Sequence, residues 1–404
     1  MPHIPMLASL TRHKLTVLLL VLQVALTCAI VCNVALMIAG RTAQMRWPSG
    51  VAEDELAMID SASLDDGSSP LARHAADLDA LRGIPGVTAA AAVDALPFNG
   101  NNWGNGIATA PNGPARLVAS AFNGTPGERQ ALGLRLVAGR DFRPDEYVPL
   151  ESAHDWDGIN HVPATIVTRA LAAQLFPGQD PLGKLVYPGD KPVRIVGVVD
   201  RLLRPALETG DGNEYAMLFP MLPDDSNVTY LLRTAPLQRE RVLKQAAEVL
   251  NRLDSDRILR HAQTFAQLRS DYFRHDRTML GLLLAAAAGL LLVTAVGIAG
   301  LASFWVQQRR RAIGIRRAIG ATRRDVLFYF QAENFLIVGG GIVLGVALAC
   351  VLNLALMQHY ELPRLPLPYL PLVAIALWLL GQLAVLGPAL RAAAVPPVVA
   401  TRTE

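Results

Sequence analysis

Four long stretches without a charged side chain restrict how this sequence can fold more than any other feature. They run from Leu15 to Ala39, Met279 to Val306, Asn334 to Gln358 and Leu365 to Leu390. A helix of about 20 residues is needed to cross about 30 Å of hydrocarbon, and each stretch exceeds that length. The hydrophobic content of 52% also favours lipid as the solvent for part of the chain. The sequence therefore predicts four transmembrane helices.

The chain between the first two stretches, Thr42 to Arg277, has the composition of a water-exposed domain. It holds 24 Lys and Arg against 30 Asp and Glu, a formal charge of −6. Short apolar runs typical of strands, such as Val193–Val199, alternate there with amphipathic helical stretches such as Leu237–Leu253. We therefore expect an α-helical membrane protein with four transmembrane helices and an α+β extracytoplasmic domain inserted between helices 1 and 2.

The positions of the cations predict the orientation of the chain. The loop from Gln307 to Asp325 contains seven arginines and a single acid, Asp325, and Arg391 follows the last apolar stretch. Lys and Arg in short loops stay on the cytoplasmic side of a membrane. We therefore expect both termini and this loop in the cytoplasm and the large domain outside. The uncharged core of the first stretch is longer than that of a signal peptide, which favours an uncleaved anchor in a bacterial inner membrane.

These patterns divide the chain into nine expected segments. They are 1–14 (cytoplasmic N-terminus), 15–40 (helix 1), 41–277 (periplasmic α+β domain ending in a helical stalk), 278–306 (helix 2), 307–327 (cytoplasmic loop), 328–358 (helix 3), 359–366 (periplasmic loop), 367–390 (helix 4) and 391–404 (cytoplasmic C-terminus). Within the domain, Val51–Ile59 is a possible helix in a connector. Thr264–Arg277 contains no helix breaker, so we expect one continuous helix from there into helix 2.

Three features resemble functional motifs but are better explained otherwise. Cys28 and Cys32 lie one helical turn apart without His or acid neighbours, which is more typical of packing than of metal binding. Gly178–Lys184 has P-loop spacing, but Leu185 replaces the Ser or Thr that holds the metal. His154, Asp155, Asp157 and His161 lie in a Gly/Pro-flanked loop that is more often solvated surface. We therefore predict no catalytic, cofactor or metal site on this chain.

The cytoplasmic loop carries the most specific pattern, Arg-Arg-Arg-Ala-Ile-Gly-Ile-Arg-Arg-Ala-Ile-Gly-Ala from residue 309 to residue 321. It resembles the signature of the MacB/FtsX family of ABC transporter permeases. Gly139-Arg140-Asp141-Phe142, the segment from Phe176 to Lys184 and Val196-Gly197-Val198-Val199 match the same family. The resemblance covers nearly the whole chain.

In that family the loop is a coupling helix that docks on a separate cytoplasmic ATPase. The resemblance therefore implies a coupling site of fourteen residues: Arg309, Arg311, Ile313, Gly314, Ile315, Arg316, Arg317, Ala318, Ile319, Gly320, Ala321, Arg323, Arg324 and Asp325. Ile313, Ile315, Ile319 and Val326 offer apolar contacts. A basic loop also commonly contacts anionic headgroups, although the ordered spacing favours docking. Ala312 stands where the family usually has Glu, which removes a possible salt bridge or N-terminal helix charge.

The resemblance implies a permease subunit that binds no cofactor itself, with ATP and Mg²⁺ on the partner ATPase. It implies a second copy or paralogue as dimer partner, a possible periplasmic adaptor and contact with membrane lipids. The formal charge of +3 comes from short flanks and loops, so we expect no nucleic acid partner. The expected activity is export or extraction of a peptide, drug or lipoprotein. The alternative is a transmitter that moves no solute and activates a periplasmic partner, as in FtsX-type cell-division proteins.

Overall fold

The computed structural model describes residues 14–63, 69–149, 156–208, 210–360 and 369–394. The chain divides into two compact units. Unit 1 comprises Met1–Arg46 and His275–Glu404, and unit 2 comprises Trp47–Arg274. Unit 2 therefore interrupts unit 1 in the sequence, after the first helix that the structure describes in unit 1.

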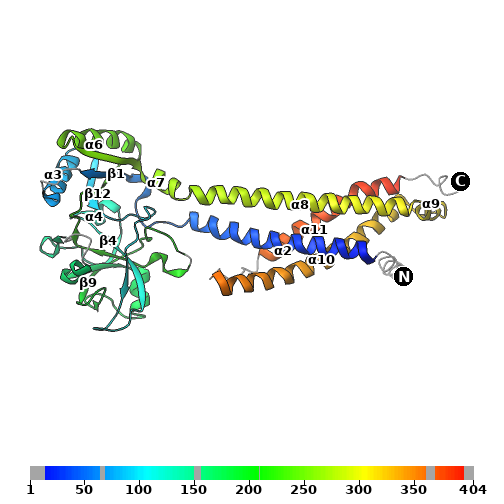
Figure 1. The fold of residues 1–404 in the computed structure, drawn as a ribbon, viewed down its shortest axis with the longest axis horizontal. Coiled ribbons are helices and arrows are strands. Elements are labelled where there is room, and N and C mark those ends of the chain that lie inside the picture. The colour runs from blue at the N-terminus through cyan, green and yellow to red at the C-terminus, as the bar shows by residue number, and fades with distance from the viewer. Residues whose placement is uncertain (1–13, 64–68, 150–155, 209, 361–368, 395–404) are drawn as a thin grey trace. The chain divides into compact units, whose positions relative to one another are not determined.

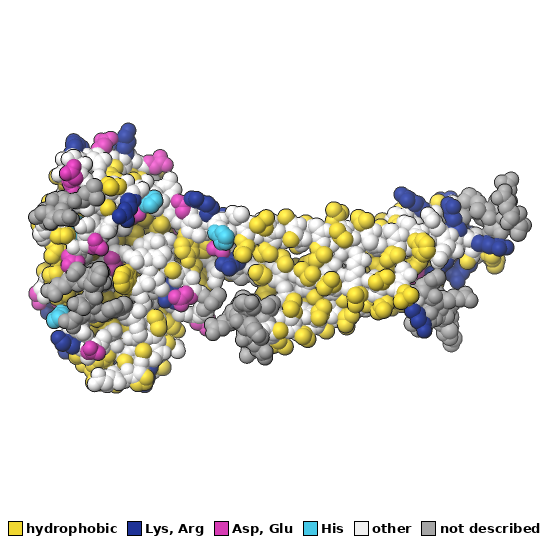
Figure 2. Space-filling view, viewed as in Figure 1, with side chains coloured by type: hydrophobic (Ala, Val, Ile, Leu, Met, Phe, Trp, Pro, Cys, Tyr) yellow, Lys and Arg dark blue, Asp and Glu magenta, His cyan; other side chains and the backbone are white. Residues whose placement is uncertain are grey.

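Unit 1 is a bundle of long apolar helices (Figure 1). Its described helices are α2 (Lys14–Met45), α8 (Arg274–Gln308), α9 (Arg310–Ala318), α10 (Arg323–Tyr360) and α11 (Tyr369–Ala393). Within the described ranges, all of these except α9 are long and apolar enough to cross a membrane. Figure 2 shows apolar side chains along the long helices, and Lys and Arg gathered at the end of the bundle where α9 lies.

Small residues allow α10 to pack directly on α2. A Cβ added to Gly345 would lie 2.5 Å from the Cβ of Cys28 and 2.6 Å from the carbonyl oxygen of Ala25. Small residues drive helix association in membranes because they let backbones approach closely. Cys28 and Cys32 are both buried in an apolar cluster with Val373 and other residues, which agrees with the packing interpretation.

Polar side chains connect α2 to α8 at two levels of the bundle. The hydroxyl groups of Thr27 and Thr294 lie 2.8 Å apart and are buried. Near the other end of the pair, Arg41 Nη1 donates to Asp276 Oδ1 at 2.6 Å. These contacts hold α2 and α8 together as a pair.

Unit 2 contains a four-stranded antiparallel sheet covered on one face by two helices. The strand order is β13 (Arg257–Thr264), β1 (Leu56–Ser63), β12 (Asn227–Thr234), β2 (Val87–Val93). The covering helices are α3 (Pro70–Arg82) and α6 (Arg239–Leu253), as Figure 1 shows. Apolar side chains of both helices, such as Leu81 and Leu250, form one core with Tyr230 of β12.

A second, mixed sheet forms the other half of unit 2. Its order is β3 (Gly104–Ile107), β4 (Leu117–Asn123), β10 (Ala216–Phe219), β7 (Ala164–Thr168), β9 (Val193–Val199) and β5 (Leu136–Gly139), with β8 (Leu185–Val186) also paired to β9. Unit 2 also contains three short helices, α4 (Glu128–Leu132), α5 (Arg169–Leu175) and α7 (Phe265–Tyr272), and one strand pair, β6 (Val148–Pro149) with β11 (Met221–Leu222). Its described 3₁₀ turns are η2 (Glu53–Glu55), η3 (Pro144–Glu146), η4 (Trp156–His161), η5 (Asp211–Glu214) and η6 (Pro236–Gln238). The predicted α+β character of this unit agrees with these elements.

The prediction of a helix over Val51–Ile59 is wrong. The segment forms η2 and then β1, which pairs with β12 on one side and β13 on the other. Seven of the eight residues of β1 are buried. Because both faces of the strand are covered, its sequence lacks the alternation of apolar and polar residues by which a half-buried strand is recognised.

The predicted continuous helix from Thr264 into helix 2 is also wrong. Thr264 and Gln267 form a capping box that begins α7, and α7 ends before Phe273. The Phe273 N–H donates to the carbonyl oxygen of Arg269 at 3.2 Å, and its side chain is buried. Tertiary packing of this aromatic ring separates α7 from α8, and local sequence gave no sign of it.

A buried ion pair stabilises the helical side of the four-stranded sheet. The Asp77 carboxylate of α3 accepts hydrogen bonds from the Tyr230 hydroxyl at 2.5 Å and from Arg257 Nη2 at 2.9 Å. The side chains of Asp77 and Arg257 are almost fully buried. Each charge therefore depends on the other for compensation.

We expect Asp77→Ala to lower the free energy of unfolding by about 3–5 kcal/mol, because it leaves the Arg257 charge buried without its partner. Asp79→Ala is the matched control, since Asp79 lies on the same helix and its pair with Arg82 is exposed. That variant should change stability by less than about 0.5 kcal/mol. Urea unfolding of the purified chain measures both, and equal effects would contradict the assignment.

Asp94 joins the two sheets where β2 ends beside β4. Its carboxylate accepts hydrogen bonds from the Asn123 backbone N–H at 2.9 Å and from Asn123 Nδ2 at 2.6 Å. Burial raises the pKa of Asp94 to about 6, although the hydrogen bonds from Asn123 act in the opposite direction. Burial also raises the pKa of the Glu128 carboxyl in α4, and the charge of Asp94 adds to that rise.

A carboxyl whose pKa is raised on folding stabilises the fold below its unfolded pKa and loses that contribution as the pH rises through the folded value. For Asp94 this window extends from about 4 to about 6. We expect the unfolding free energy of wild type, relative to Asp94→Asn, to fall across this window by roughly 1 kcal/mol per unit of pKa shift. Urea unfolding at several pH values measures the difference, and parallel pH profiles for the two proteins would contradict it.

Candidate functional site

The cytoplasmic loop motif folds into α9 and a defined turn. Gly320 has φ +108°, and its N–H donates to the carbonyl oxygen of Arg317 at 3.2 Å, while the Ala321 N–H donates to that of Arg316 at 3.1 Å. This pair of bonds is a Schellman C-cap, which requires the left-handed conformation that glycine adopts readily. The Gly-Ala pair of the motif is therefore explained by the end of α9.

The next helix begins immediately after this cap. The Thr322 hydroxyl accepts a hydrogen bond from the Asp325 N–H at 3.2 Å, and the Asp325 carboxylate accepts from the Thr322 N–H at 2.8 Å. Reciprocal bonds of this kind form a capping box. Arg323, Arg324 and Asp325 thus lie in the first turn of α10, where the sequence predicted the end of the loop.

One side of α9 is fixed to the bundle by three residues spaced four apart. Arg309, the residue before α9, donates from Nη1 to both carboxylate oxygens of Glu333 at 2.9 and 3.2 Å. Ile313 is 6% exposed and belongs to the core cluster of the bundle. Arg317 Nη1 donates to the carbonyl oxygen of Ala393 at the end of α11, at 3.1 Å. Residues four apart share a helix face, so this face is attached to α10 and α11.

The opposite side of α9 is exposed. Ile315 and Ile319 are 46% and 82% exposed, and Arg311 is exposed on the same ridge. Ala312, Ala318, Arg323 and Arg324 are also exposed, whereas the guanidinium of Arg316 lies 5.1 Å from the ring centre of Tyr329. Apolar side chains surrounded by cations suit a helix that binds in a groove of another protein.

The structure separates the fourteen predicted site residues into three groups. Arg309, Ile313, Gly314 and Arg317 face the bundle, Gly320, Ala321 and Asp325 build the turn, and the remaining seven residues are exposed or stacked on Tyr329. Ile313 and Val326, which were also expected to offer apolar docking contacts, have side chains buried in the core of their own chain. Ile315 and Ile319 remain available.

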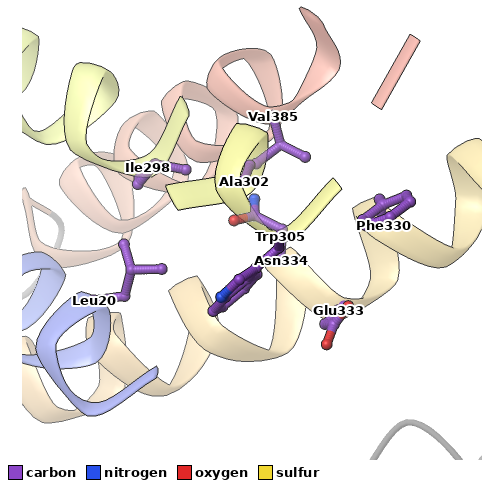
Figure 3. A pocket seen from close by; sticks show the side chains of 8 residues that line it. All are labelled: Leu20, Ile298, Ala302, Trp305, Phe330, Glu333, Asn334 and Val385. Atoms are coloured by element: carbon purple, nitrogen blue, oxygen red, sulfur yellow. The ribbon is translucent and has the colours of Figure 1, made fainter. Parts of the chain in front are cut away.

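Glu333 is the site residue that sequence analysis missed. Its side chain is 3% exposed and lies beside a cavity lined by residues of four helices. Figure 3 shows these side chains: Leu20, Ile298, Ala302, Trp305, Phe330, Glu333, Asn334 and Val385. Asn334 Nδ2 donates to the carbonyl oxygen of Gly381 at 3.0 Å, which links α10 to α11. The sequence signal that could have identified Glu333 is an acid directly before an uncharged stretch, because an acid within a membrane needs a partner.

The other family-like motifs lie in unit 2 and contact one another. Gly139 of β5 pairs with Gly197 of β9, and a Cβ on Gly139 would lie 2.2 Å from the carbonyl oxygen of Val196. Arg140 pairs with Glu146 at 2.5 Å, which lowers the pKa of that carboxyl. These contacts form a junction at the edge of the mixed sheet and explain the glycines as close backbone approaches.

The structure describes the whole P-loop-like segment but only part of the histidine cluster. Gly178 and Gly183 adopt positive φ values, and the segment leads into the strand β8. A phosphate-binding loop leads into a helix instead. In the cluster of His154, Asp155, Asp157 and His161, which was interpreted as solvated surface, His154 and Asp155 lie outside the described residues.

Comparison with known proteins matches two family models to the chain. The MacB-like periplasmic core domain matches residues 19–259, and the FtsX-like permease C-terminal domain matches residues 284–397. The second match includes α9 and its flanking helices.

Curated relatives include the macrolide export ATP-binding/permease proteins MacB of Bartonella henselae and Rhodospirillum rubrum. They are 32% and 30% identical over 53% and 60% of this chain, and the alignments span 32% and 38% of the relatives' length. The uncharacterized ABC transporter permease YknZ of Bacillus subtilis is 26% identical over 45% of this chain and 47% of its own length. The chain thus spans about a third of the length of these two MacB relatives.

Two solved structures also align with part of the chain. The extracellular domain of YknZ from Gram-positive bacteria aligns at 20% identity and a TM-score of 0.31, over 50% of this chain and all of that domain. The periplasmic region of MacB from Actinobacillus actinomycetemcomitans aligns at 14% identity and a TM-score of 0.35, over 55% of this chain and 94% of that region.

The assignment of the two faces of α9 predicts different effects of alanine substitutions on stability. We expect Ile313→Ala to cost about 2 kcal/mol or more, because it leaves a cavity in the bundle core. Ile315→Ala is the matched control and should cost less than about 0.5 kcal/mol, because its side chain is exposed. Thermal unfolding of the detergent-solubilised chain measures the pair. A larger loss for Ile315→Ala would show that the faces of α9 are assigned the wrong way round.

Proposed function

Since this chain belongs to the MacB/FtsX-like family of ABC transporter permeases, we propose that its α9 docks on a separate cytoplasmic ABC ATPase. The permease then passes the work of ATP hydrolysis to the extracytoplasmic domain formed by unit 2. ATP and Mg²⁺ are bound by the partner, and this chain is a non-catalytic subunit.

The carrying observation is the division of α9 into two faces. One face is attached to α10 and α11 through Arg309, Ile313 and Arg317. The other presents Ile315 and Ile319 between cations. A helix held rigidly on one side and apolar on its exposed side is suited to receive a push from a docked protein and deliver it to the helices behind.

The proposed topology follows from the same end of the bundle. Figure 2 shows Lys and Arg gathered where α9 lies, and cations of this kind stay in the cytoplasm. We therefore place α9 and both termini in the cytoplasm, the helices α2, α8, α10 and α11 across a bacterial inner membrane, and unit 2 in the periplasm between the first and second spans.

The proposed activity is export or extraction of a peptide, drug or lipoprotein. The printed names of the MacB relatives, which describe macrolide export, support this class. The proposed assembly contains two permease copies, or one copy and a paralogue, and the ATPase. A periplasmic adaptor and surrounding lipids are further proposed partners.

Two observations favour docking over simple attachment to anionic lipid. Attachment to headgroups needs cations but does not need the specific ridge of Ile315 and Ile319. It would also act equally through Arg391, an exposed cation at the end of α11. Docking on a protein partner instead depends on α9 and not on other basic positions such as Arg391.

We expect the detergent-solubilised wild-type chain to recover an ABC-type ATPase in an affinity pull-down, and Arg311→Glu/Ile315→Glu to lose it. Both substitutions lie on the exposed face, so the fold should persist. Arg391→Glu is the charge-matched control and should retain the ATPase. Mass spectrometry identifies the recovered proteins, and ATP hydrolysis by the eluate measures the activity of the complex. If neither wild type nor control recovers an ATPase, the proposed function is wrong.

A further inference from the structure

Unit 2 is joined to α2 and α8 through two short connectors. The first connector, Trp47–Glu55, begins two residues after α2 ends, and the second connector, Phe265–Phe273, ends immediately before α8 begins. Both connectors belong to unit 2. Movement of α2 or α8 that travels along the chain therefore reaches the sheets through these connectors.

One arginine fastens the two connectors together. Arg269 of α7 donates from Nη1 to both carboxylate oxygens of Glu53, at 2.5 and 2.6 Å, and from Nη2 to the carbonyl oxygen of Trp47 at 2.7 Å. Glu53 also accepts a hydrogen bond from the Ser49 hydroxyl at 2.6 Å. Charge-assisted hydrogen bonds between partly buried groups are stronger than ordinary surface pairs.

A strained aromatic residue packs against this ion pair. Phe98 has φ +70° and is 2% exposed. Its ring lies 5.9 Å from that of Phe265 and 5.4 Å from those of Tyr272 and Phe273, between ring centres, and 5.1 Å from the Arg269 guanidinium carbon. A bulky residue in the left-handed region persists only where its surroundings determine its position strongly. Phe98 follows β2, so the contact reaches the four-stranded sheet.

The segment that follows β9 of the mixed sheet, residues 201–208, also contacts the connectors. The Leu203 N–H donates to the carbonyl oxygen of Ser49 at 2.9 Å, and the Leu207 N–H donates to the Tyr272 hydroxyl oxygen at 2.8 Å. Gly50 has φ +91°, and a Cβ there would lie 2.2 Å from the carbonyl oxygen of Arg201. The same segment therefore contacts both connectors.

We propose that Glu53, Arg269, Phe98, Phe273 and Tyr272 form a connector clasp, which makes both connectors and the adjoining ends of both sheets a single cooperative unit. Through the clasp, movement of α2 and α8 reaches the two sheets together. This inference rests on the proposed function only for the source of that movement. The clasp itself is a property of this chain alone.

Hydrogen exchange of the full chain tests the clasp without a partner. Glu53→Gln should raise exchange about tenfold or more in α7 and in residues 201–208, neither of which is local to residue 53 in the sequence. Glu55→Gln is the matched control, because Glu55 lies in the same 3₁₀ turn but pairs with Arg233. It should leave α7 and residues 201–208 unchanged. A rise confined to the residues around position 53 would overturn the clasp.

Tyr272→Phe provides a second variant that removes a single oxygen and keeps the ring. It should raise exchange at Leu207 and in the first connector, which Tyr272 reaches through Phe98 and Arg269 and also through residues 201–208. Unchanged exchange in the first connector would count against cooperativity. In the complex with the ATPase, nucleotide should change exchange in both sheets of the wild-type chain. The complex that contains the Glu53→Gln variant should still bind and hydrolyse ATP through its ATPase, but without that change in the sheets. A wild-type chain that recovers no ATPase overturns the proposed function, and the exchange of the chain alone still decides the clasp.

Discussion

The ion pair between Arg309 and Glu333 is the contact on which the geometry of the candidate site depends. An acid buried in an apolar bundle needs a compensating cation, and Arg309, the residue directly before α9, supplies one to Glu333. Compensating Glu333 therefore fixes where α9 begins. Once that position is fixed, the helical repeat places Ile313 and Arg317 toward the bundle and Ile315 and Ile319 away from it. The exposed face is thus a consequence of a buried charge.

The sequence predicted much of the fold because its strongest signals are local. Long uncharged stretches identified the four apolar helices, and the amphipathic repeat over Leu237–Leu253 predicted α6. It failed at β1, where burial of both faces removes the alternation, and at Phe273, where a distant aromatic residue ends a helix. Both failures concern contacts between residues far apart in the sequence, which no local pattern encodes.

The candidate site shows the same limit at the level of single residues. The loop motif located α9, and its glycine pattern is explained by the Schellman cap. The motif could not divide its residues between faces, because the partner of Arg309 lies 24 residues later on another helix. Ile313 and Ile315 look equivalent in the sequence, yet one is a core residue and the other is exposed. Only the packed bundle distinguishes residues that hold α9 from residues that α9 presents.

The departure from the family pattern at Ala312 gains a definite meaning from this division. Ala312 is exposed, so a Glu at this position would face away from the bundle. The acid of the loop, Asp325, is engaged by Thr322 in the cap of α10. The exposed face of α9 consequently offers cations and apolar side chains and no carboxylate of its own. For the proposed docking on an ATPase, electrostatic complementarity favours a groove that carries acids and has no need of a cation opposite residue 312. The alanine therefore bears on which ATPase this permease is proposed to bind, while the attachment of α9 to its own bundle does not depend on it.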